Sequence, residues 1–141
     1  RDLRMSRGLG DVYKRQADFT TAKGREVMEK YLQKYKDIDV VVSQNDDMTF
    51  GAIEAIRAAG KTTGTGGDIT LISFDGTRSA LEKVKSGVIN VDIECNPLQG
   101  TYIQEIINRL EDGEPVDKIN YVEEKVYTQK NVLSVLGDRV Y

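Results

Sequence analysis

The chain has 141 residues and a mass of 15.8 kDa, and its 39% hydrophobic and 30% charged residues are ordinary for a globular domain. This composition excludes a disordered chain, and no apolar run approaches the roughly 20 residues of a transmembrane helix. The sequence contains no histidine, which excludes Ser-His-Asp and Cys-His nucleophile pairs and imidazole-based zinc sites. A single cysteine, Cys95, excludes an internal disulfide and a thiolate metal cluster.

The first sixteen residues differ in composition from the rest of the chain. Residues 1–16 carry five basic and two acidic residues and show no apolar period, and we predict that they are a disordered, non-native sequence of the kind left by a vector. Without them, 15 basic and 21 acidic residues remain, which gives a net charge of −6. An acidic chain does not favour nucleic acid as a partner, because phosphates require a basic surface.

Helical and extended patterns alternate after residue 16. The apolar periods predict helices over residues 23–36, 46–60, 79–86 and 98–110. Strands are predicted over residues 39–43, 69–74 and 88–93, a partly extended region over 119–127, and a further short strand within 131–136. This alternation predicts an α/β fold with a mainly parallel sheet and helices on both of its faces.

Each of the three main strands is followed by polar residues: Gln44-Asn45-Asp46, Asp75-Gly76 and Glu94-Cys95-Asn96. Parallel strands place their carboxyl ends on one edge of the sheet, so these side chains are expected to converge in one crevice. Amide and carboxylate groups there can bind the hydroxyls of an uncharged polyol, and binding without reaction is the simpler interpretation.

Structural roles compete with ligand binding at the same positions. Asn45 and Asp75 fit equally well as turn residues with no ligand role. Asp46 or Asp47 is expected to be the N-cap of the second helix. The sequence alone leaves these alternatives open.

Two segments, VVVSQNDDMTFGAIEAIRAAG and ITLISFDGTRSALEKVKSGVINVDIECNPLQG, resemble the carboxyl-terminal half of periplasmic sugar-binding proteins of the ribose and galactose type. Regulators of the LacI type share that fold. The resemblance implies two lobes that close on one monosaccharide, with Asn45 and Asp75 as ligand contacts and a third contact at Glu94 or Asn96. The last motif departs from ribose binders, and Glu-Cys-Asn-Pro resembles the galactofuranose-type branch.

The resemblance also implies how the chain is divided. Residues 17–95 correspond to the second lobe, residues 96–127 to a segment of the first lobe, and residues 128–141 to a return into the second lobe. Most of the first lobe would then be missing, and the chain is expected to be a fragment.

Three functions from different classes follow. The resemblance favours the solute-binding subunit of an ABC-type sugar importer, which binds a monosaccharide and a membrane permease, needs no cofactor, contacts no nucleic acid, is not an enzyme, and is periplasmic or extracellular and membrane-anchored. The alternative is the sugar-effector domain of a LacI-type transcriptional regulator. A third hypothesis is a phospho-acceptor enzyme that would use Asp75, with Asp46 and Asp47 near magnesium.

Overall fold

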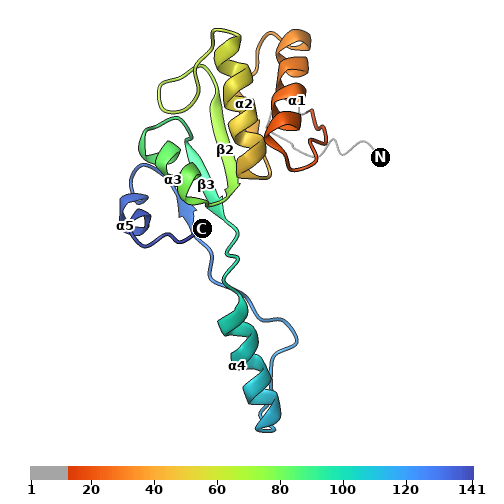
Figure 1. The fold of residues 1–141 in the computed structure, drawn as a ribbon, viewed down its shortest axis with the longest axis vertical. Helices are drawn as coiled ribbons and strands as arrows, with labels where there is room; N and C mark the ends of the chain where they lie inside the picture. The colour runs from red at the N-terminus through yellow and green to blue at the C-terminus, as the bar shows by residue number, and fades with distance from the viewer. Residues whose placement is uncertain (1–12) are drawn as a thin grey trace.

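The computed structural model describes residues 13–141, and these contain a four-stranded sheet (Figure 1). Its strands lie in the order β1 (Val40–Val42), β2 (Thr70–Asp75), β3 (Val91–Glu94) and β4 (Val126–Tyr127). The first three are parallel and β4 is antiparallel to β3. The predicted α/β class with a mainly parallel sheet is therefore confirmed.

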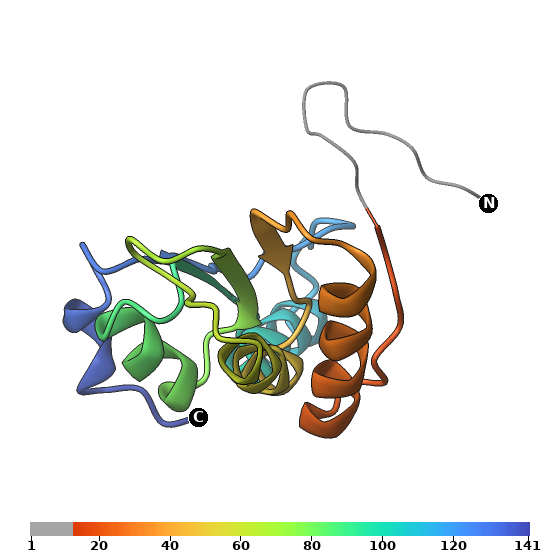
Figure 2. The same ribbon diagram turned by 90° about the horizontal axis from the view of Figure 1, so that it is seen from above.

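Within residues 13–141, five helices accompany the sheet: α1 (Thr21–Lys34), α2 (Asp46–Ala58), α3 (Arg78–Lys85), α4 (Gly100–Glu111) and α5 (Leu133–Leu136). Figure 2 shows α1, α2 and α3 on the same side of the sheet. Among the described residues, the prediction of helices on both faces is therefore confirmed for one face only.

The two faces of the sheet differ in burial because side chains alternate along each strand. Leu71 and Asp92 face the helices and are fully buried. The opposite face includes Val40, Val42 and Val126, which are 52%, 58% and 52% exposed. This open face is apolar, as expected for a sheet that is covered on both sides in a larger protein.

Most predicted elements agree with the structure to within a few residues, but two differ. Residues 131–136 do not form a strand; the side chain of Asn131 accepts a hydrogen bond from the Thr128 amide at 2.8 Å, and this turn leads into the short helix α5. Of the extended region 119–127, only Val126 and Tyr127 pair with β3. The prediction for residues 1–12 lies outside the described part, whereas Tyr13 to Gln16 are exposed and the Tyr13 ring stacks on Tyr35.

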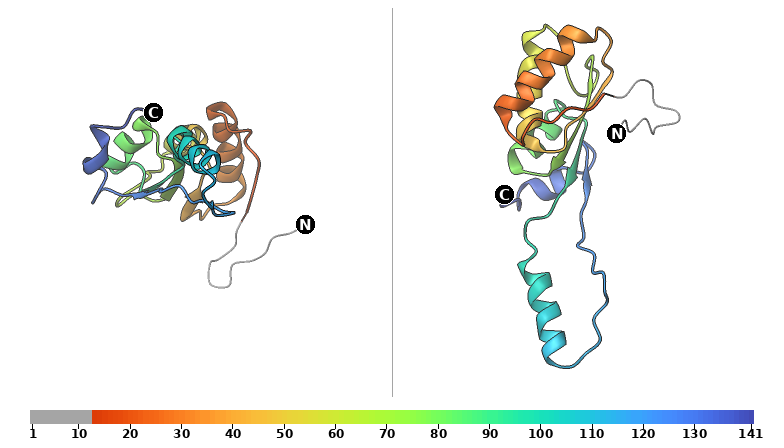
Figure 3. Two further views of the ribbon diagram at one scale, coloured as in Figure 1. Left: turned by 90° about the horizontal axis from the view of Figure 1, so that it is seen from below. Right: turned by 90° about the vertical axis from the view of Figure 1, so that its right-hand side faces the viewer.

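Helix α4 and its two connectors project from the rest of the molecule as an arm, here called the α4 arm (residues 96–125). Figure 3 shows α4 beside the long connector that returns to β4. The helix buries none of its residues, and its apolar side chains Ile103, Ile107 and Leu110 are exposed. No helix in the described residues combines the length and apolar character needed to cross a membrane.

Two glycines allow α1 and α2 to pack at short range. A Cβ added at Gly51 of α2 would lie 2.0 Å from the Thr21 carbonyl oxygen, and one at Gly24 of α1 would lie 2.4 Å from the Met48 carbonyl oxygen. The contacting atoms are backbone, so they cannot move aside as a flexible side chain would. This close contact holds α1 against α2 beside β1 and β2.

We expect Gly51→Ala to lower the free energy of unfolding by about 1–3 kcal/mol, because the new methyl group forces the two helices apart. Chemical denaturation of the purified chain measures the change. Gly100→Ala is the matched control, since a Cβ at that helical position meets nothing within 4 Å. A loss of stability no larger than in the control would contradict the close-packing interpretation.

Candidate functional site

Asn45 lies at the carboxyl end of β1 and is the N-cap of α2. Its side-chain oxygen accepts a hydrogen bond from the Met48 amide at 2.8 Å, and its side-chain nitrogen donates to Asp75 Oδ2 at 3.1 Å. The prediction that Asp46 or Asp47 caps this helix is therefore wrong. Both residues lie inside its first turn, where negative charge interacts favourably with the helix dipole. The amide of Asn45 reaches the N-terminal amides of α2 because its backbone is extended.

Asp75, the last residue of β2, has an unusual backbone conformation. Its φ is 117°, in a region of backbone conformation that residues with a Cβ rarely adopt, and Gly76 follows at φ 75°. The Asp75 carbonyl accepts a hydrogen bond from the Cys95 amide at 3.1 Å, which ties the bend to the end of β3. Backbone strain of this kind costs on the order of 1–3 kcal/mol and clusters at functional positions.

Glu94 ends β3 in register with Asp75, but its carboxylate points into a buried network. It accepts hydrogen bonds from Arg139 Nη1 at 2.5 Å and the Tyr141 hydroxyl at 2.7 Å, and from the Tyr127 hydroxyl and the Lys125 amide, both at 3.0 Å. Desolvation raises the pKa of Glu94, but the hydrogen bonds from Tyr141, Arg139 and Tyr127 outweigh it and hold the pKa below its ordinary value.

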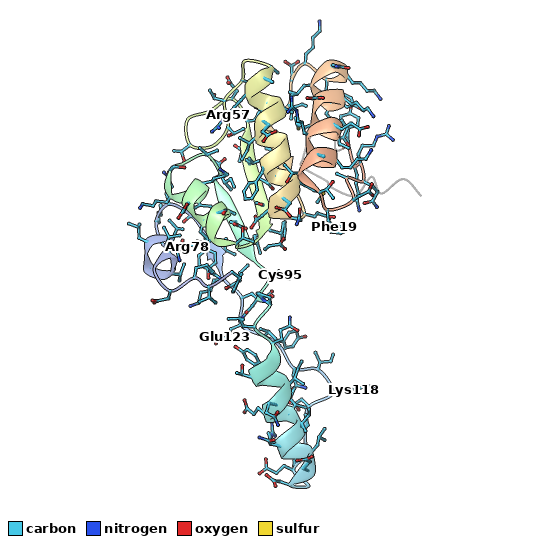
Figure 4. The ribbon with its side chains drawn as sticks, in the orientation of Figure 1. Phe19, Arg57, Arg78, Cys95, Lys118 and Glu123 are labelled. Atoms are coloured by element: carbon cyan, nitrogen blue, oxygen red, sulfur yellow. The ribbon has the colours of Figure 1, made fainter. Side chains whose placement is uncertain are left out.

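Asn96 lies two residues beyond β3, at the start of the α4 arm. Its side-chain oxygen accepts from the Leu98 amide at 2.8 Å, and its own backbone amide donates to Glu124 at 3.1 Å. Figure 4 shows Cys95 and Glu123 at the same neck between the sheet and the arm. A hollow of about 320 Å³ at this neck is lined by residues that include Glu94, Asn96, Tyr102, Arg139 and Tyr141.

A second buried carboxylate, that of Asp46, is hydrogen-bonded to residues on either side of the Asp75 bend. Asp46 accepts hydrogen bonds from Ser73 Oγ at 2.5 Å, from the Thr77 hydroxyl at 2.7 Å and from the Thr77 amide at 2.9 Å. Burial raises the pKa of Asp46, while these hydrogen bonds oppose that effect. Asp92, also fully buried on this side, has a pKa raised to about 8, first by desolvation and then by the charge of Asp46.

The structure brings together some of the predicted residues and not others. Asn45 and Asp75 are in direct contact at the carboxyl edge, as the parallel strands predict. Glu94 is next to them in the sheet but faces Arg139, and Asn96 belongs to the neck. Arg139, Tyr127 and Tyr141 were not predicted as neighbours of Glu94, because no local sequence pattern indicates that they converge on it. The described residues contain no group of His, Cys, Asp or Glu that could hold a metal ion.

Comparison with known proteins finds relatives of this chain among sugar-binding proteins. The chain is 38% identical over 120 residues to the ribose import binding protein RbsB of Bacillus subtilis, which covers 84% of this chain and 37% of the relative. It is 33% identical over 114 residues to the galactofuranose-binding protein YtfQ of Escherichia coli, covering 78% of this chain and 35% of the relative. The chain thus spans less than half the length of these relatives.

Solved structures show the same likeness. A protein from Mycobacterium smegmatis solved in complex with β-D-fucofuranose matches with a TM-score of 0.76 and 38% identity, over 86% of this chain and 40% of that one. A galactofuranose binding protein matches with a TM-score of 0.75 and 30% identity, over 87% of this chain and 42% of that one. Residues 8–115 match the family described as periplasmic binding protein domain. The resemblance drawn from the sequence is confirmed, and the chain belongs to the periplasmic binding protein family.

Proposed function

We propose that this chain forms part of a solute-binding protein of an ABC-type sugar importer and contributes one wall of its monosaccharide site. The observation that carries the proposal is the contact between Asn45 and Asp75 at the carboxyl edge of the parallel sheet. The relatives of this chain include a ribose import binding protein and a galactofuranose-binding protein. Binding there needs no catalysis and no cofactor. The proposed location is periplasmic or extracellular, with membrane anchoring, and a membrane permease is the proposed partner.

Asn45 and Asp75 are the proposed direct contacts with sugar hydroxyls. Asp75 is half-buried, and a carboxylate can accept hydrogen bonds from two hydroxyls at once. Of the two further candidates, Asn96 is favoured over Glu94 as the third contact, because the Glu94 carboxylate already accepts hydrogen bonds from four groups. Glu94 is then a positioning residue for the neck.

The proposed division into lobes remains that of the sequence analysis: residues 17–95, 96–127 and 128–141. The α4 arm supports it, because this segment leaves the sheet, exposes an apolar helix surface and returns to pair with β3. Exposed apolar residues on the arm and on the open sheet face are suited to contact with the remainder of a two-lobed protein. Two lobes that close on a ligand would expel water from both walls of the site.

The other two hypotheses have less support. The ribose relative named above is an import binding protein, which favours transport over the effector domain of a LacI-type regulator. A phospho-acceptor enzyme would need free carboxylates beside Asp75. Asp46 is instead committed to Ser73 and Thr77, and Asp47 is exposed.

Calorimetric titration of the longest product of this gene with ribose, fructose, arabinose, galactose and fucose tests the proposed function. We expect one of these sugars to bind with a dissociation constant in the micromolar range or below, and the anomer and ring form in the complex can be assigned by NMR. Absence of binding to all five sugars would contradict the proposal. Sugar-sensitive binding to operator DNA would instead support the LacI-type alternative.

A further inference from the structure

The strained Asp75 is held from both sides by one buried carboxylate. Asp46 accepts hydrogen bonds from Ser73, two residues before Asp75, and from Thr77, two residues after it. The two anchor points span the residue whose φ is 117°. Asp46 therefore fixes the direction in which the Asp75 carboxylate leaves the end of β2.

Asp92 is the buried group of this region that the proposed function does not use. It lies on β3 in register with Ser73 of β2 and Tyr127 of β4, on the helix-covered face of the sheet. Its side chain is fully buried beside Asp46 and the Gly76 amide, and neither of its oxygens makes a hydrogen bond of good geometry. An ionised carboxylate in such surroundings would be strongly disfavoured.

The ionisable groups around Asp92 favour its neutral form. Asp46 faces it from α2 and Asp75 from β2, and both are acidic. Tyr127 faces it from β4, but its hydroxyl is committed to Glu94 and Arg139. The buried guanidinium of Arg139 is itself paired with Glu94, and Arg78, Glu82 and Lys85 of α3 are exposed.

We propose that Asp92 is a protonated positioning residue, which shares the buried site with ionised Asp46 and so keeps Asp46 bound to Ser73 and Thr77 on either side of Asp75. Two adjacent buried carboxylates cannot both ionise without strong repulsion. Loss of the Asp92 proton would push Asp46 away from Ser73 and Thr77, and the strained bend at Asp75 would relax. The proposal rests on the proposed function only in assigning Asp75 to the sugar.

The consequence for ligand binding is a loss of affinity at alkaline pH. The pKa of Asp92 is about 8, so its proton is present at neutral pH and is lost as the pH rises through this value. If the ionised form does not bind, the association constant falls by about tenfold per pH unit above the midpoint. Asp92→Asn keeps a neutral group of similar shape and should remove this dependence.

The test compares the wild type with Asp92→Asn and with the control Asp117→Asn, which changes an exposed carboxylate. Each protein is titrated by calorimetry between pH 6 and 10 with the sugar that binds in the five-sugar panel above. We expect affinity to fall above about pH 8 in the wild type and in Asp117→Asn, and to stay constant in Asp92→Asn. An unchanged alkaline fall in Asp92→Asn, or a constant affinity in the wild type, would overturn the proposal.

A second measurement does not depend on sugar binding. Carboxyl carbon NMR of the chain without ligand should show one aspartate that titrates near pH 8, and amide signals of Ser73 and Thr77 that shift with the same midpoint. Both effects should disappear in Asp92→Asn. If every aspartate titrates in the ordinary range, the inference fails even where sugar binds. If the signals titrate as expected but no sugar binds, the proposed function is contradicted, while the proposed interaction of protonated Asp92 with Asp46 is supported.

Discussion

Replacing Arg139 by methionine is expected to lower the free energy of unfolding by about 3–5 kcal/mol, the usual cost of removing one partner of a buried ion pair. The side chains of Arg139 and Glu94 are 5% and 9% exposed, and their closest atoms are 2.5 Å apart. Methionine fills much of the volume but leaves the Glu94 carboxylate buried without its cation. Arg139 also stacks on Tyr127 and Tyr141, so the C-terminal segment should detach from β3.

Chemical denaturation of the purified chain measures this effect, with Arg25→Met as the matched control. Arg25 pairs with Glu29 at 2.9 Å, but those side chains are 50% and 44% exposed, so the control should cost no more than about 1 kcal/mol. Adding Glu94→Gln to Arg139→Met should recover part of the loss, because the unpaired charge is removed. Equal losses in Arg139→Met and Arg25→Met would show that the buried pair does not hold the C-terminal segment.

The pH dependence of this network has the opposite sign to that of Asp92. The pKa of Glu94 is held below its ordinary value, so its contribution to stability is present at neutral pH and is lost as the pH falls through the acidic range. Asp92 has a raised pKa, and it reduces stability as the pH rises from the ordinary aspartate range towards 8. These two residues of β3 therefore change stability in opposite directions as the pH rises.

The sequence predicted those parts of the fold that depend on local pattern. Apolar periods located α1 to α4 and the three parallel strands to within a few residues, because each element buries one stripe or face. The same reasoning predicted that Asn45 and Asp75 would be neighbours, since the carboxyl ends of parallel strands share an edge. Their role as ligand contacts stays a prediction.

Long-range pairing explains most of what the sequence could not predict. A glutamate at the end of a strand has the same local pattern whether it faces a ligand or, like Glu94, an arginine 45 positions along the chain. Asp92 alternates with Val91 and Ile93, a pattern typical of a solvent-facing position, yet it lies under the helices. The prediction of a strand within residues 131–136 also failed, because the side chain of Asn131 starts a turn there.

Asp75→Ala is expected to weaken sugar binding at least 100-fold in the full-length protein that the gene encodes. A carboxylate that accepts from two hydroxyls makes two charge-assisted hydrogen bonds, each worth about 1.5–3 kcal/mol in a desolvated site. The substitution also removes the acceptor for the Asn45 side chain, so two proposed contacts change together. Calorimetry measures the affinity, and circular dichroism shows whether the fold is kept.

Asp75→Gly separates the loss of binding from a loss of folding. Glycine adopts a φ of 117° without the steric cost that a Cβ imposes, so this variant should be as stable as the wild type or more stable by about 1 kcal/mol, while it binds sugar no better than Asp75→Ala. Asp47→Ala is the control, because it removes an exposed carboxylate from the same edge without touching Asp75. Unchanged affinity in both Asp75 variants would place the sugar elsewhere, whereas lost binding in a stabilised Asp75→Gly protein would mean that the strain at this residue serves the ligand.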